Sequence, residues 1–128
     1  MISGRDPLSP EEQIRTAIKE MVEGAEERRL EPFKKHLSEQ LEDQNGLGKK
    51  DILQRLRVLF LRHPEIHLSI LSLDMTGSGN QVRKVQMELL MSSTSIPQNR
   101  GIYDFTFRQE DGDWNLWYMD WGQGYGLE

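Results

Sequence analysis

The sequence predicts an α+β fold in which three N-terminal helices pack on a curved antiparallel β-sheet. Two observations carry this prediction. Apolar residues recur at helical spacing between residues 10 and 63, and from residue 66 onwards they alternate with polar residues at the strand period of two. Helices followed by strands, in a chain of only 128 residues, indicate helices on one face of a single antiparallel sheet.

The first helix is expected to begin at Pro10. Ser9 provides the N-cap, Pro10 takes the first helical position and Glu12 closes a capping box. The apolar positions that follow are Ile14, Ala17, Ile18, Met21, Val22 and Ala25. Their spacing places them on one stripe of an amphipathic helix, which we expect to face the core.

Two further helices are expected. Pro32 opens a short second helix that carries Phe33, Leu37 and Leu41, and the turn-forming segment 43–48 ends it. The third runs from about Lys49 to the residue before Pro64. Its predicted buried side consists of Ile52, Leu53, Leu56, Leu59 and Phe60, and its outer side is basic, with Lys49, Lys50, Arg55, Arg57 and Arg62. A solvated face is the ordinary explanation of these cations, and a docking site for an acidic partner is the alternative.

The remaining chain predicts four strands. The first changes phase between Ile70 and Leu71, as a β-bulge would require. A turn at 76–80 precedes the second strand, a loop at 92–101 precedes the third, and Asp111-Gly112 predicts a hairpin before the fourth. The fourth strand, from about Asp113 to Trp121, is apolar on both faces and is therefore expected to be covered on both sides.

Composition narrows the classes of function. The net charge of −5 disfavours binding to nucleic acid, and the absence of cysteine excludes disulfides and thiolate chemistry. No apolar run is long enough to span a membrane, and residues 1–10 lack the core of a signal peptide. We expect a soluble, cytoplasmic domain at residues 10–122 between a flexible leader, 1–9, and a flexible tail, 123–128; an exported form with a trimmed signal is the alternative.

The three histidines, His36, His63 and His67, share no helical face that would favour a metal site. Surface or capping roles are expected for them. No phosphate-binding loop or dinucleotide motif is present, so the sequence predicts neither a metal nor a cofactor.

The order of elements resembles the nuclear transport factor 2-like superfamily, the cystatin-like cone fold shared with ketosteroid isomerase and the polyketide cyclases. The resemblance covers residues 10–122. It rests on the opening helix, on Leu30-Glu31-Pro32-Phe33, on Phe60-Leu61-Arg62-His63-Pro64 at the end of the third helix, and on the closing hairpin through Asp111-Gly112-Asp113-Trp114. The pattern is specific to the fold but not to one activity.

The resemblance implies a pocket inside the cone and a homodimer. The implied pocket residues are Met21, Phe60, Met87, Phe105, Trp117, Met119 and Trp121, and the implied dimer face is Trp114, Leu116 and Tyr118. It also places the catalytic base of the isomerases near Asp43, one oxyanion donor at Tyr103 and the other at Met21. A thioether cannot donate a hydrogen bond, so the isomerase reaction itself is not expected.

Three functions follow as hypotheses. The first is a non-catalytic domain that binds a small apolar molecule or a partner in an aromatic-lined cone. The second is a small isomerase, cyclase or dehydratase with Asp43 as base and Tyr103 as donor. The third is a structural module for dimerisation.

Overall fold

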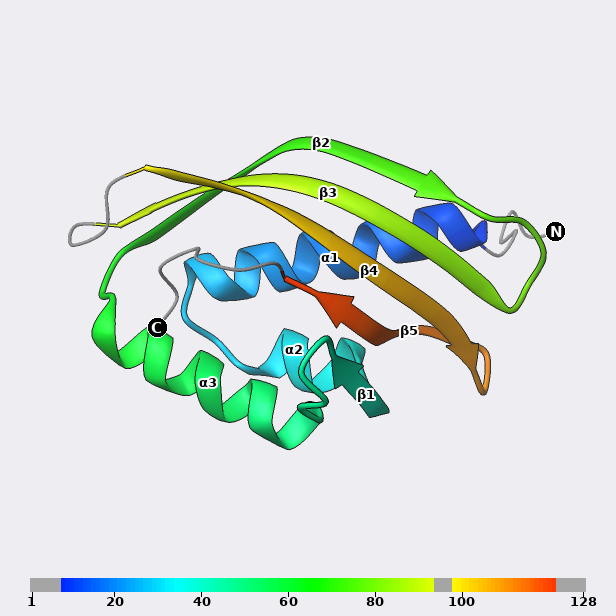
Figure 1. The fold of residues 1–128 in the computed structure, drawn as a ribbon, viewed down its shortest axis with the longest axis horizontal. Coiled ribbons are helices and arrows are strands. Elements are labelled where there is room, and N and C mark those ends of the chain that lie inside the picture. The colour runs from blue at the N-terminus through cyan, green and yellow to red at the C-terminus, as the bar shows by residue number, and fades with distance from the viewer. Residues whose placement is uncertain (1–7, 94–97, 122–128) are drawn as a thin grey trace, which may run out of the picture.

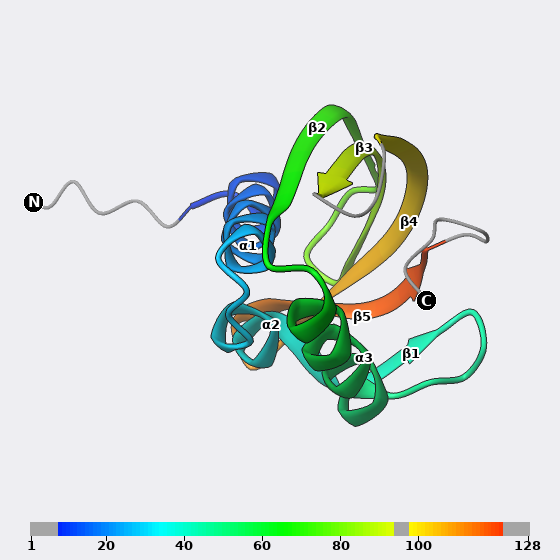
Figure 2. The same cartoon turned by 90° about the vertical axis from the view of Figure 1, so that its left-hand side faces the viewer.

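The computed structural model describes residues 8–93 and 98–121, which form one curved sheet with helices on its concave side (Figures 1 and 2). In chain order the elements are α1 (Pro10–Glu26), α2 (Glu31–His36), β1 (Leu37–Asp43), α3 (Lys49–Arg62), β2 (Ile66–Thr76), β3 (Val82–Ser93), β4 (Asn99–Glu110) and β5 (Asp113–Asp120). The strand order is β1-β5-β4-β3-β2. β1 pairs with β5 in parallel, and the other pairs are antiparallel.

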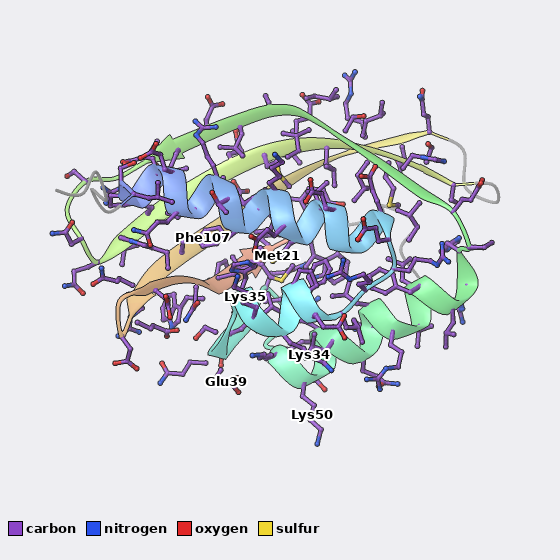
Figure 3. All side chains as sticks on the ribbon, turned by 180° about the vertical axis from the view of Figure 1, so that it is seen from behind. Met21, Lys34, Lys35, Glu39, Lys50 and Phe107 are labelled. Carbon is purple, nitrogen blue, oxygen red and sulfur yellow. The ribbon has the colours of Figure 1, made fainter. Side chains whose placement is uncertain are left out.

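Helix α1 begins as predicted. The Glu12 amide donates to Ser9 Oγ at 3.1 Å, and the Ser9 amide donates to Glu12 Oε1 at 3.0 Å. The stripe of α1 that faces the sheet is buried, including Met21. Figure 3 labels Met21 on α1 and Phe107 on β4, and Phe107 is completely buried. The layer between α1 and the sheet is therefore the hydrophobic core.

The prediction of a second helix that reaches Leu41 is wrong. Helix α2 ends at His36, and Leu37 and Leu41 lie on strand β1, where both are buried. Residues four apart share one face of a helix and also one face of a strand, so their spacing could not distinguish the two. The fold thus has five strands, with β1 inserted between the second and third helices.

The predicted bulge in β2 is confirmed. Ile70 pairs with Leu89 and Ser72 pairs with Glu88, so Leu71 is the extra residue on β2. The predicted hairpin is confirmed as well, because Asp111 and Gly112 both have positive φ, 52° and 89°, as a tight two-residue turn requires.

The last strand, β5, also contains a bulge, and its residues 114–120 are buried or partly buried, which agrees with the predicted cover on both faces. Leu116 pairs with Phe107 and Tyr118 pairs with Thr106, which leaves Trp117 unpaired. The extra residue moves the inward face from even to odd positions. Trp114 and Leu116 before the bulge therefore lie in the core, so they cannot form the predicted dimer face with Tyr118.

The predicted loop 92–101 is shorter in the structure, since β3 continues to Ser93 and β4 begins at Asn99. Residues 94–97 of that loop, most of the predicted leader (1–7) and the predicted tail (123–128) lie outside the described residues. Among the described helices, none is both long and apolar enough to cross a membrane.

Polar contacts attach the helices to their neighbours. The guanidinium of Arg83 on β3 is buried, pairs with Glu11 on α1 at 3.0 Å, and lies 5.6 Å from the ring centroid of Trp114. Between α1 and α2, His36 Nε2 donates to Glu20 Oε1 at 2.6 Å. This hydrogen bond, with help from the charge of Lys35, holds the pKa of Glu20 below its ordinary value of 4.5.

The Glu20–His36 contact predicts an acid-dependent loss of stability. Because the pKa of Glu20 is lowered in the folded state, its contribution is complete above about pH 4.5 and is lost as the pH falls through the lower folded value. We expect Glu20→Gln to reduce the free energy of unfolding at pH 7 and to make progressively less difference as the pH falls below 4.5. Urea unfolding at a series of pH values between 7 and 3 measures this free energy. Glu23→Gln, at an exposed position on the same helix, is the control. A Glu20→Gln effect that does not change with pH would contradict this account.

Candidate functional site

A cavity of about 200 Å³ lies between the helices and the concave face of the sheet. Every helix and every strand contributes to its wall. The lining residues are Ile18, Met21, Val22, Ala25, Phe33, Leu37, Ile52, Arg55, Leu56, Leu59, Ile66, Leu68, Met87, Leu89, Met91, Tyr103, Phe105, Leu116, Met119 and Trp121. The cavity is therefore built by the whole fold rather than by one loop.

The cavity wall is almost entirely apolar. Four of its residues are methionines, whose flexible thioethers adapt to the shape of whatever they contact. Among the described lining residues, Arg55 is the only charged side chain, and Tyr103 carries the only hydroxyl. Such a wall favours apolar molecules, and a few polar groups would orient them.

Most of the predicted pocket residues lie in this wall. Met21, Met87, Phe105, Met119 and Trp121 all line the cavity, as does Tyr103, whose ring centroid lies 6.1 Å from that of Phe105.

Two predicted pocket residues lie elsewhere. Phe60 packs in a second cluster with Ile66 and Met91. Trp117 lies 5.4 Å from the guanidinium of Arg108, because the bulge in β5 turns it away from the interior. Leu116, a residue of the predicted dimer face, lies before the bulge and lines the cavity.

The carboxylate of Asp43 stabilises the turn after β1. Its Oδ1 accepts hydrogen bonds from the amides of Asn45 at 2.8 Å and Leu47 at 2.7 Å. Its Oδ2 accepts from the indole Nε1 of Trp121 at 3.0 Å. Asp43 is 3% exposed and is not among the lining residues. It therefore holds Trp121 in place from behind the cavity wall.

This arrangement bears on the proposed base. A general base needs a lone pair directed at the substrate. The Asp43 carboxylate instead accepts three hydrogen bonds from within the protein. The Trp121 side chain also lies between this carboxylate and the cavity. The contacts instead indicate that the Asp43 carboxylate closes its own turn, as Asp commonly does after a helix or strand. The catalytic role of Asp43 and Tyr103 remains a prediction that these contacts do not support.

The histidines occupy separate positions. His36 bonds to Glu20, and His63 is the C-cap residue of α3, with Nδ1 3.4 Å from Ser93 Oγ. Across the described residues, no group of three or more His, Asp or Glu side chains is arranged to hold a metal ion.

Comparison with solved structures identifies the fold. The chain superimposes on a nuclear transport factor 2-like protein of unknown function from Pseudomonas putida, with a TM-score of 0.76 and 11% sequence identity. The match covers 95% of this chain and 93% of the Pseudomonas putida chain. An uncharacterised protein with a cystatin-like fold from Caulobacter vibrioides matches 86% of each chain, with a TM-score of 0.73 and 9% identity.

A third match is hexachlorocyclohexane dehydrochlorinase from Novosphingobium barchaimii, with a TM-score of 0.73 and 12% identity over 86% of this chain and 83% of that one. No family model and no curated protein matches the sequence. The chain therefore has the nuclear transport factor 2-like fold, as the sequence resemblance predicted. At these identities the similarity extends to the fold and not to a shared activity.

The Asp43–Trp121 hydrogen bond predicts that substitutions at these two residues have non-additive effects on stability. In Asp43→Asn, one side-chain oxygen can still accept from the turn amides, but the new amide group would face the indole N–H, and two donors cannot bond. We expect a loss of about 1–3 kcal/mol in the free energy of unfolding, measured in urea. In a Trp121→Phe background the same substitution should cost less, because no indole N–H remains. Equal costs in both backgrounds would contradict the coupling.

Proposed function

We propose that this protein is a non-catalytic binding protein that holds a small apolar molecule inside its cone. The observation that carries the proposal is the cavity of about 200 Å³, whose described wall is apolar at all but a few positions. A ligand in this cavity would make dispersion contacts with the apolar wall atoms, and these contacts would stabilise the protein.

The size of the cavity suits a small ligand. An engineered protein cavity of about 150 Å³ with aliphatic and aromatic walls binds benzene. A cavity of about 200 Å³ therefore suits a molecule of one ring or a short alkyl chain. The four methionines in the wall would allow several such shapes to fit.

The wall also favours binding over catalysis. Within the described residues, no carboxylate and no imidazole lines the cavity. The isomerase, cyclase and dehydratase reactions need a general acid or base within hydrogen-bond reach of the substrate, and carboxylates and imidazoles are the commonest of these groups. The enzymatic activity of the dehydrochlorinase with the same fold is therefore not assigned to this chain.

The dimerisation hypothesis has less support. Of the three residues predicted for the dimer face, Trp114 and Leu116 are buried within the protomer, at 4% and 3% exposure. Two buried side chains cannot anchor a second copy. The homodimer that the resemblance implies remains a prediction.

Native mass spectrometry of the freshly purified protein tests the proposal, together with a variant that fills the cavity. Leu56 lines the cavity from α3, and Val58 on the same helix lies outside it at 37% exposure. We expect the wild type and Val58→Trp to retain a small apolar molecule that denaturation releases, or to take one up when it is added. Leu56→Trp should lose this binding, because the indole would occupy the space.

Equal binding by Leu56→Trp and Val58→Trp would place the ligand elsewhere and overturn the proposal. The proposal would also be overturned if none of the three proteins bound added apolar compounds of the right size.

A further inference from the structure

We propose that the ligand is an amphipathic anion, a small carboxylic acid with an apolar tail, and that Arg55 binds its carboxylate. This proposal rests on the apolar site proposed above. Arg55 is on α3, it lines the cavity and it is exposed to solvent. A residue that both lines the cavity and is exposed lies at its rim, where an apolar tail could lie inside and a carboxylate could remain near water.

The position of Arg55 in α3 breaks the helical pattern. The side of α3 that faces the cavity consists of Ile52, Arg55, Leu56 and Leu59, which follow the spacing of one helical stripe. Arginine occupies a place where this pattern calls for an apolar residue. Local exceptions of this kind occur where function overrides packing. Arg55 is one of the basic residues predicted on the outer side of α3; it is exposed, as a solvated face requires, and it also lines the cavity.

The guanidinium of Arg55 is available to a ligand. Within the described residues, none of the ion pairs includes Arg55. The nearest carboxylate along its own helix face, that of Asp51, accepts a hydrogen bond from the amide of Gly48 at 3.2 Å. Arginine presents a planar set of donors that matches a carboxylate with two parallel hydrogen bonds.

The other cations of α3 differ from Arg55. Lys49 bonds to Glu39 at 2.7 Å, and Lys50 points away from the body of the protein (Figure 3). Arg57 contacts Gln54 at 3.4 Å and does not line the cavity. These residues add positive charge around α3, but only Arg55 joins that charge to the apolar wall. An ordinary solvated arginine that covers apolar surface with its stem is the competing explanation, and it predicts no preference for anions.

A series of matched probes separates these explanations. Straight-chain carboxylates of about six to ten carbons suit the cavity volume, and the alcohols and amines of equal length change only the head group. We expect the best carboxylate to bind about five- to tenfold more tightly than its alcohol, and the amine to bind more weakly than both, by calorimetry at low salt. The preference should decrease as salt is raised, because Arg55 is exposed.

Substitution of the arginine completes the test. Arg55→Gln should remove the preference for carboxylate and leave alcohol binding unchanged, whereas Arg57→Gln should bind like the wild type. Arg55→Lys should restore part of the preference, since it keeps the charge but not the planar donors. Melting temperatures would establish that all three variants fold.

Each outcome decides the proposal. A carboxylate that binds no more tightly than its alcohol, or a preference that survives Arg55→Gln, would overturn the anion proposal and leave the apolar site intact. No binding by either the carboxylates or the alcohols would overturn the apolar site itself.

Discussion

The constraint on which this structure depends is the curvature of its sheet. Extra residues in two strands, Leu71 in β2 and Trp117 in β5, bend the sheet around the helices. A flat sheet could pack against α1 along its whole length, but a strongly curved one leaves its centre beyond the reach of the helical side chains. The cavity of about 200 Å³ follows from that geometry, and each helix and strand contributes to its wall.

Polar contacts support this apolar interior from outside it. Asp43 holds the indole of Trp121 against the cavity, Arg83 ties β3 to α1 through Glu11, and His36 ties α2 to α1 through Glu20. All three lie at the edges of the hydrophobic layer, where buried polar groups can find partners. Charged residues therefore fix the positions of the walls, while the space between them remains apolar.

The sequence was sufficient to predict helix α1, the bulge at Ile70-Leu71 and the hairpin at Asp111-Gly112, because each depends on residues that are close together in the chain. It was insufficient for β1, where Leu37 and Leu41 fit a helix and a strand equally well and where the partner, β5, is distant in the chain. The bulge at Trp117 had a signal that was missed. Trp114 and Leu116 are in one phase and Met119 and Trp121 in the other, the same change of phase that identified the bulge in β2. The contribution of Arg55 to the cavity wall was not predicted, since a basic residue at this spacing is typical of a solvated face.

The most direct measurement is a crystal structure of the protein under xenon pressure, because xenon enters dry apolar cavities without needing a specific head group. The account predicts xenon density between α1, α3 and the concave face of the sheet, in contact with the methionines of the wall. An interior filled by its own side chains, with no xenon bound there, would contradict the claim that this fold encloses an apolar binding site.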